Sequence, residues 1–428
     1  MARRVQRGMA MALKSGVGWV VTRISGLGLC LLLGLTQSTS AQDLIRPSTP
    51  GGPVRLITSD AALLEAQDTR KDLPCTVTPT KPSLGFDLKY HSGYDVSINL
   101  KDLAGTDNLL TIVFRVAPED HPDDSVYFSQ HITVPVIDDN DRGPAYLNGT
   151  FDLGEGKYHI DWLMRDRSER VCSFHWDSEA SLPAKDKPMA LDIAAGIAQP
   201  TDPELFKQDP PVTREQHDQP LRVKVVVNFA PQDSSAAALQ PLDTNALVAI
   251  LRNISRDPRI GRFSIVAYNM QEQRVLYRQE SASQIDFPAL GSALNKLSLG
   301  TVDLKHLVQK HGESEFLGSL LTAEVKDSKE APDAVIFAGP KVMLDDGLPP
   351  DTLKQFGDVK FPVFYMNYNL YPQANPWRDA IGNAVKAWKG IEYTISRPRD
   401  LFFAWSEIMG RIVKLKLGRT GSGNSSSQ

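Results

Sequence analysis

The sequence predicts a multidomain α+β protein, in which an antiparallel β-sandwich precedes an α/β domain with a doubly wound, mostly parallel six-stranded sheet. Two observations lead to this prediction. Residues 71–195 alternate apolar and polar positions, and turns rich in Gly, Asn and Asp separate the short runs. Residues 221–415 instead carry continuous apolar runs between helical patterns, which is typical of parallel strands buried on both faces.

The first 41 residues predict a secretory signal peptide. Basic residues precede an apolar run from Leu27 to Leu35, and the small residues of 38–41 follow it. Such a run is too short to span a bilayer. A retained membrane anchor is the alternative interpretation. We expect a secreted or periplasmic chain that has no membrane span after the signal is cleaved.

Composition limits the classes of partner. The chain has 428 residues and a formal net charge of −4. Cleavage of the signal lowers Lys plus Arg from 47 to 42 against 51 Asp plus Glu, which makes the net charge −9. Phosphate backbones are bound by clustered Lys and Arg, so this balance argues against a nucleic-acid partner.

Proline and glycine content predicts the domain boundaries. Residues 42–70 contain RPSTPGGP and indicate a linker. A second, Pro-rich linker is expected over 196–220, and a disordered tail over 416–428. These segments leave the β-sandwich at 71–195 and the α/β domain at 221–415.

Alternating patterns over the β-sandwich predict successive strands. They are expected at 86–90, 94–100, 109–116, 126–136 and 158–164, with a last strand within 189–198. The stretch from Leu153 to Tyr158, LGEGKY, resembles the tyrosine corner of immunoglobulin-like folds. This resemblance is architectural and implies no activity.

Two cysteines, Cys75 and Cys172, remain once the signal is removed. Both flank the β-rich region, and an oxidising compartment favours a disulfide between them. The alternative is a pair of buried free thiols.

In the α/β domain, buried strands and amphipathic helices alternate. Leu247, Ile250, Leu251 and Ile254 share one helix face, and Asp243 or Thr244 is the expected cap. Strands are expected at 223–227, 263–270, 274–279, 334–339, 363–367 and 391–396. Further helices are expected near 288–297, 314–325, 351–356, 375–388 and 399–415.

This order of one strand, one helix, a hairpin and further strand–helix units resembles the von Willebrand factor A family. The resemblance covers about 195 of the 428 residues and rests on topology more than on motif. Together with the signal peptide and the immunoglobulin-like domain ahead of it, it resembles exported bacterial proteins related to the A domains.

Many A domains bind a divalent metal through Asp-x-Ser-x-Ser after the first strand and an Asp after the fourth. Here Asn228 replaces the Asp, and Ala230 and Gln232 replace the two Ser. Gly339 lies where the fourth strand would be followed by Asp. The resemblance therefore implies a degenerate site, and we expect no metal and no cofactor.

Motifs for catalysis are missing from the sequence. It contains no Gly-x-Ser-x-Gly, no His-Glu-x-x-His and no phosphate-binding loop, so we expect a protein that is not an enzyme. The alternative is an exported hydrolase with an unrecognised site at the carboxyl edge of the sheet. Asp233, Ser234 and Ser235 are its candidates, and they are also the candidates for a metal site in shifted register.

Open α/β sheets bind ligands at the carboxyl edge of their strands. There we expect a protein partner from the envelope or the extracellular space, contacted by the loops 228–235, 338–348 and 369–376. Exposed aromatic residues are frequent in interfaces. The candidate contact residues are Asp233, Ser234, Asn369, Tyr371 and Trp377. The sequence thus predicts an adhesion or scaffold function, with a purely structural envelope component as a further alternative.

Overall fold

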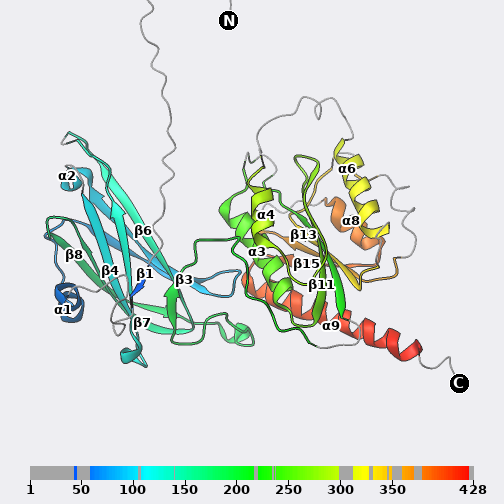
Figure 1. Cartoon of the computed structure of the whole chain (residues 1–428), viewed down its shortest axis with the longest axis horizontal. Helices are drawn as coiled ribbons and strands as arrows, with labels where there is room; N and C mark the ends of the chain where they lie inside the picture. Colours follow the sequence, from blue (N-terminus) through cyan, green and yellow to red (C-terminus); the bar gives the residue numbers. More distant parts are fainter. Residues whose placement is uncertain are drawn as a thin grey trace, which may run out of the picture. The chain divides into compact units, whose positions relative to one another are not determined.

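The computed structural model (Figure 1) describes most of the chain after residue 57. The described residues are 43–45, 58–104, 108–138, 140–215, 220–233, 236, 238–297, 312–326, 331–344, 347–348, 359–370 and 378–423. Contacts divide the chain into Met1–Thr39 and Ser40–Gln428. The predicted signal peptide lies outside the described residues.

Two antiparallel sheets form the first part of the described chain. One has the strand order β1-β5-β4-β7-β8 and the other β2-β3-β6-β9. Their bounds are β1 Asp43–Ile45, β2 Thr76–Leu84, β3 Tyr90–Asn99, β4 Leu109–Pro118, β5 Val126–Thr133, β6 Pro144–Leu153, β7 Gly156–Arg165, β8 Val171–Ala180 and β9 Ala198–Pro200. Short helical segments lie among them: α1 Thr58–Ala66, α2 Leu100–Leu103, η1 Pro122–Asp124 and η2 Ala184–Asp186. The strand expected within 189–198 is absent, and the short β9 pairs with β6 instead.

Both sheets contribute to one hydrophobic core. Tyr94 of β3 meets Phe114 of β4 at 5.5 Å and Trp162 of β7 at 5.4 Å between ring centroids. Phe114 also stacks on Phe128 at 4.8 Å and lies 5.4 Å from Phe151. All five rings are buried, because the alternating apolar positions of each strand face the opposite sheet.

Tyr158 makes the corner contact that the sequence predicts. Its buried hydroxyl lies 3.0 Å from the carbonyl oxygen of Gly154 and 3.2 Å from that of Ile197. The side chain therefore joins the turn before β7 to the segment that leads into β9.

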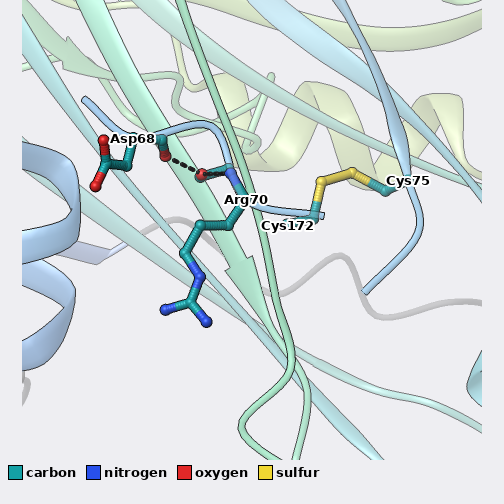
Figure 2. The surroundings of a disulfide bond; sticks show 5 residues. Asp68, Arg70, Cys75 and Cys172 are labelled. Carbon is teal, nitrogen blue, oxygen red and sulfur yellow. Dashed lines mark hydrogen bonds between the residues drawn. A yellow bond between two sulfur atoms is a disulfide. The ribbon is translucent and has the colours of Figure 1, made fainter. Parts of the chain in front are cut away.

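The predicted disulfide between Cys75 and Cys172 is confirmed (Figure 2). It links the residue before β2 to β8. Next to it, Ser173 Oγ accepts from the Arg70 N–H at 2.8 Å and donates to the Asp68 carbonyl at 2.6 Å. The chain that leads into β2 is thus attached to β8 by covalent and hydrogen bonds.

His91 of β3 gives this part of the protein a testable pH dependence. Hydrogen bonds with Asp152 at 2.8 Å and Asp87 at 3.0 Å raise the pKa of His91 to about 10. The charged ring therefore stabilises the fold fully below its unfolded pKa of about 6.5, and this contribution is lost as pH rises through about 10. We expect the difference in free energy of unfolding between wild type and His91→Gln to shrink from pH 6 to pH 10, measured by urea denaturation. A difference that stays constant over this range would contradict the assignment.

A mixed six-stranded sheet forms the second part, with the order β12-β11-β10-β13-β14-β15. All its pairs are parallel except β11 with β12. The strands are β10 Leu221–Asn228, β11 Ile260–Asn269, β12 Arg274–Ala282, β13 Ala334–Gly339, β14 Val363–Tyr368 and β15 Ile391–Ile395. The doubly wound, mostly parallel sheet expected from the continuous apolar runs is present.

Helices cover both faces of this sheet (Figure 1). They are α3 Pro241–Arg256, α4 Phe287–Leu294, α6 Gly312–Leu321, α8 Ala380–Ala387 and α9 Pro398–Gly423, and the π-helix η3 Thr322–Lys326 follows α6. Val225 of β10 packs in the core with α3, α4 and α9. Val226 packs in the opposite core with α6 and α8. The continuous apolar run is therefore explained by burial on both faces.

The expected linkers and tail also differ from the sequence expectations, because the expected linker over 42–70 contains the strand β1, which pairs with β5, and the helix α1. The expected linker over 196–220 contains Asp209, which is buried and bonded to Arg252 at 2.6 Å and to Arg256 at 3.1 Å, both on α3. The structure also continues α9 to Gly423, whereas a disordered tail was expected from residue 416. The proline content of 196–220 indicated a linker, but it could not reveal that Asp209 forms ion pairs with Arg252 and Arg256, which lie more than 40 positions away.

Candidate functional site

The carboxyl ends of the parallel strands form the candidate site. Asn228 ends β10, Gly339 ends β13 and Tyr368 ends β14, and these three strands are neighbours in the sheet. Gly339 pairs in register with Asn367. The loops that follow the three strands therefore begin at one edge, as the sequence predicts.

A side-chain bridge joins the loop after β10 to the loop after β14. Gln232 Nε2 donates to Asn369 Oδ1 at 2.8 Å, and Gln232 Oε1 accepts from the Leu370 N–H at 2.7 Å. The Asn369 N–H donates in turn to the carbonyl of Ile395 at 2.8 Å. Since β13 lies between β10 and β14, this bridge joins loops from two strands that are not adjacent.

Gly339 lies against β10 in a conformation that favours glycine. Its φ is +141°, and a Cβ at this position would lie 2.8 Å from the Cβ of Asn228. Asn228 Oδ1 accepts from the Met270 N–H at 3.2 Å, whereas its buried Nδ2 has no hydrogen-bond partner. Asn228 and Gly339 thus support the close packing of β10 against β13.

A buried tyrosine connects the strand ends to α3. The Tyr368 hydroxyl donates to Asp243 Oδ1 at 2.9 Å and approaches the Ala230 carbonyl at 3.4 Å. Burial raises the pKa of Asp243. The helix cap expected at Asp243 or Thr244 is wrong, because α3 begins earlier, after Gln240, and the Asp243 carboxylate binds Tyr368 instead.

Two further acidic residues, Asp379 and Glu392, lie on the α8 side of the same edge. Asp379 caps α8, and its Oδ1 accepts from the Ile381 N–H at 3.1 Å and the Val342 N–H at 3.2 Å. Burial raises the pKa of Asp379 to about 6, and the charge of Glu392 adds to this shift. The sequence analysis missed this residue, although an Asp just before an apolar helix is a recognisable cap signal.

The predicted contact residues fall into three groups. Asp233 is exposed. Asn369 is only 3 % exposed, so the structure places it beneath the surface, where it holds the Gln232 bridge. Ser234, Tyr371 and Trp377 lie outside the described residues.

Met343 is an exposed residue that the sequence analysis did not single out. It follows β13 and is 52 % exposed, whereas the flanking Val342 and Leu344 are buried. Methionine adapts its shape readily to a partner. The only sequence signal was its position in the predicted contact loop 338–348.

The described residues bring no three His, Cys, Asp or Glu side chains together as a metal-ligand group. Within the same ranges, no helix is long and apolar enough to cross a membrane.

Comparisons with known proteins do not place the chain in a family. No family model matches it, and no curated protein matches its sequence. Among solved structures, a glycosyl hydrolase family 2 member from Bacteroides cellulosilyticus is 10 % identical, with a TM-score of 0.18 over 76 % of this chain and 39 % of its own. A mutant of the PilB minor pilin from Streptococcus sanguinis is 8 % identical, with a TM-score of 0.27 over 79 % and 78 %.

A β-glucuronidase from Bacteroides uniformis is 9 % identical, with a TM-score of 0.17 over 74 % of this chain and 38 % of its own. The chain therefore spans about two fifths of the length of the two hydrolases. At such low TM-scores, none of these likenesses supports an argument about fold or activity.

Proposed function

We propose that this chain is an exported, non-enzymatic protein that binds a protein partner. In this proposal an immunoglobulin-like β-sandwich precedes a von Willebrand A-like domain, and the carboxyl edge of its sheet contacts the partner. Recognition involves no metal at the degenerate positions. The partner lies in the envelope or the extracellular space.

The bridge between Gln232 and Asn369 is the observation that carries the proposal. A side chain that accepts and donates across two loops holds them in one arrangement before any partner arrives. Such preorganisation lowers the entropy lost on binding.

The residues around the bridge support a surface for protein binding. Met343 offers an exposed apolar contact, and Asp233 a charged one. The positions that a metal would need are occupied by side chains with structural contacts, such as Asn228 and Gln232. Both observations favour direct contact between protein surfaces.

We expect Met343→Ala and Gln232→Ala each to weaken partner binding about tenfold, which corresponds to a loss of about 1.4 kcal/mol in binding free energy. Met343→Ala removes an exposed contact, and Gln232→Ala releases the two loops. The tagged chain would be used to capture a partner from envelope extract, and the affinity for the purified partner would then be measured by calorimetry.

Leu415→Ala is the matched control, since Leu415 is also exposed, at 48 %, but lies on α9. This variant should bind the partner as tightly as wild type.

Unchanged affinity for the partner in both Met343→Ala and Gln232→Ala would refute the proposed surface. Turnover of a hydrolase substrate panel that is lost in Asp233→Asn would establish the alternative, an exported hydrolase.

A further inference from the structure

Within the described residues, three buried polar atoms from strand ends and the start of α8 at the carboxyl edge have no hydrogen-bond partner. They are Asn228 Nδ2, Asn367 Oδ1 and Asp379 Oδ2. Their residues are at most 7 % exposed. Buried polar groups are nearly always paired, so such atoms point to a bound water or ion. Asn367 and Asp379 are the two that offer oxygen atoms.

One carboxylate oxygen of Asp379 and one of Glu392 lie close to Gly382 on α8. A Cβ on Gly382 would lie 3.1 Å from Asp379 Oδ2 and 3.1 Å from Glu392 Oε2. The two oxygens are therefore no more than about 6 Å apart, twice that distance. A side chain at position 382 would crowd both oxygens, and glycine allows them to approach α8 closely.

Asn367 carries a third oxygen atom next to Glu392. Its Nδ2 donates to Glu392 Oε1 at 3.2 Å, which fixes the orientation of the carboxamide and leaves Oδ1 as the acceptor without a partner. The residue is completely buried on β14. The Asn367 carboxamide thus orients the Glu392 carboxylate through Nδ2, and its Oδ1 is available as a further ligand.

The charge at this place is not balanced by an ion pair. In the parts of the chain that the structure describes, neither Asp379 nor Glu392 forms a salt bridge with Lys or Arg. Burial raises the pKa of Asp379, although the charge of Lys341 acts in the opposite direction. Asp379 is buried and Glu392 is partly buried, and the charges of two neighbouring carboxylates that are shielded from solvent favour binding of a proton or a cation.

We propose that Asp379, Glu392 and Asn367 form a calcium site at the base of the carboxyl edge. Calcium binds carboxylate and carboxamide oxygens at 2.3–2.6 Å and accepts irregular coordination completed by water. Magnesium requires nearly ideal octahedral coordination. Three ligands from β14, β15 and the start of α8 do not enforce that geometry, so the site favours calcium.

The site is separate from the degenerate positions Ala230 and Gln232, and it does not depend on the proposed partner binding. Its ion would lie below the surface, where Asp379 is 7 % exposed. It would hold the start of α8 against β14 and β15, and through Val342 it would also hold the loop after β13.

Terbium luminescence and calorimetry on the full chain, first stripped with EDTA, test the site. Tyr365 is buried beside Asp379 and can sensitise a bound lanthanide. We expect terbium emission that calcium displaces, a calcium-dependent rise in Tm, and a much smaller response to magnesium. Both Asp379→Asn and Glu392→Gln should weaken calcium binding about tenfold or more, because each removes a ligand charge.

Asp379→Asn retains a side-chain oxygen for the α8 cap, so the variant should fold. Glu407→Gln is the control, because Glu407 is an exposed acid that pairs with Arg411 on α9 and should not affect calcium binding. The proposal is overturned if wild type binds no calcium at millimolar concentration, or if both site variants bind it as well as the control. It is also overturned if the site variants are stabilised equally with and without calcium, because the site would then hold a proton.

Discussion

Removing the disulfide between Cys75 and Cys172 should lower the free energy of unfolding of the β-sheet region by about 4 kcal/mol. The two cysteines are 97 residues apart, so the bridge closes a long loop and strongly restricts the unfolded chain. The variant carries Cys75→Ala and Cys172→Ala together. Hydrogen exchange with mass spectrometry on peptides from 71–195 would report this loss separately from the α/β part.

Reduction provides the matched control. A reductant should destabilise wild type by a similar amount and leave the double variant unchanged. The native protein should also gain the mass of two protons on reduction. Two free thiols in the unreduced, denatured wild type, or a double variant as stable as wild type, would contradict the prediction.

Phe114→Ala should destabilise the same region by about 3–5 kcal/mol. Phe114 is completely buried and contacts Tyr94, Phe128 and Phe151. Truncation removes its apolar surface and leaves a cavity that rings held by both sheets cannot fill. Urea denaturation, monitored by hydrogen exchange of peptides from residues 71–195, would measure the loss in free energy of unfolding.

Tyr146→Ala is the control for this experiment. Tyr146 lies on β6 in the same region, but it is 75 % exposed. Its replacement should change stability by no more than about 0.5 kcal/mol. Equal losses in the two variants would mean that the aromatic cluster is not the centre of this core.

The sequence was most informative where a pattern is local. Val223, Val225, Val226 and Val227 are apolar positions interrupted only by Lys224. They lie in the strand β10, which is buried on both faces. Leu247 and Ile254 share the buried face of α3, as their spacing predicts. The alternating positions of β3 and β4 also fill one core. Each of these follows from residues a few positions apart.

Contacts between distant residues could not be predicted in this way. The bridge from Gln232 to Asn369 spans 137 positions, and neither residue belongs to a motif. Asn367 and Glu392 meet across two strands. Asn369 was expected at the surface because it lies in an aromatic, Pro-containing loop, but its bonds to Gln232 and Ile395 keep it buried.

The sequence by itself determined the type and order of the main strands and helices and the edge of the sheet at which the strand ends meet. Hydrophobic periodicity and the parallel order of strands suffice for these, since both are properties of neighbouring residues. Only the tertiary structure decided that Gln232 joins two loops and that Asp379 and Asn367 both lie close to Glu392. Such arrangements depend on the register of separate strands and on burial, which single-residue patterns do not encode.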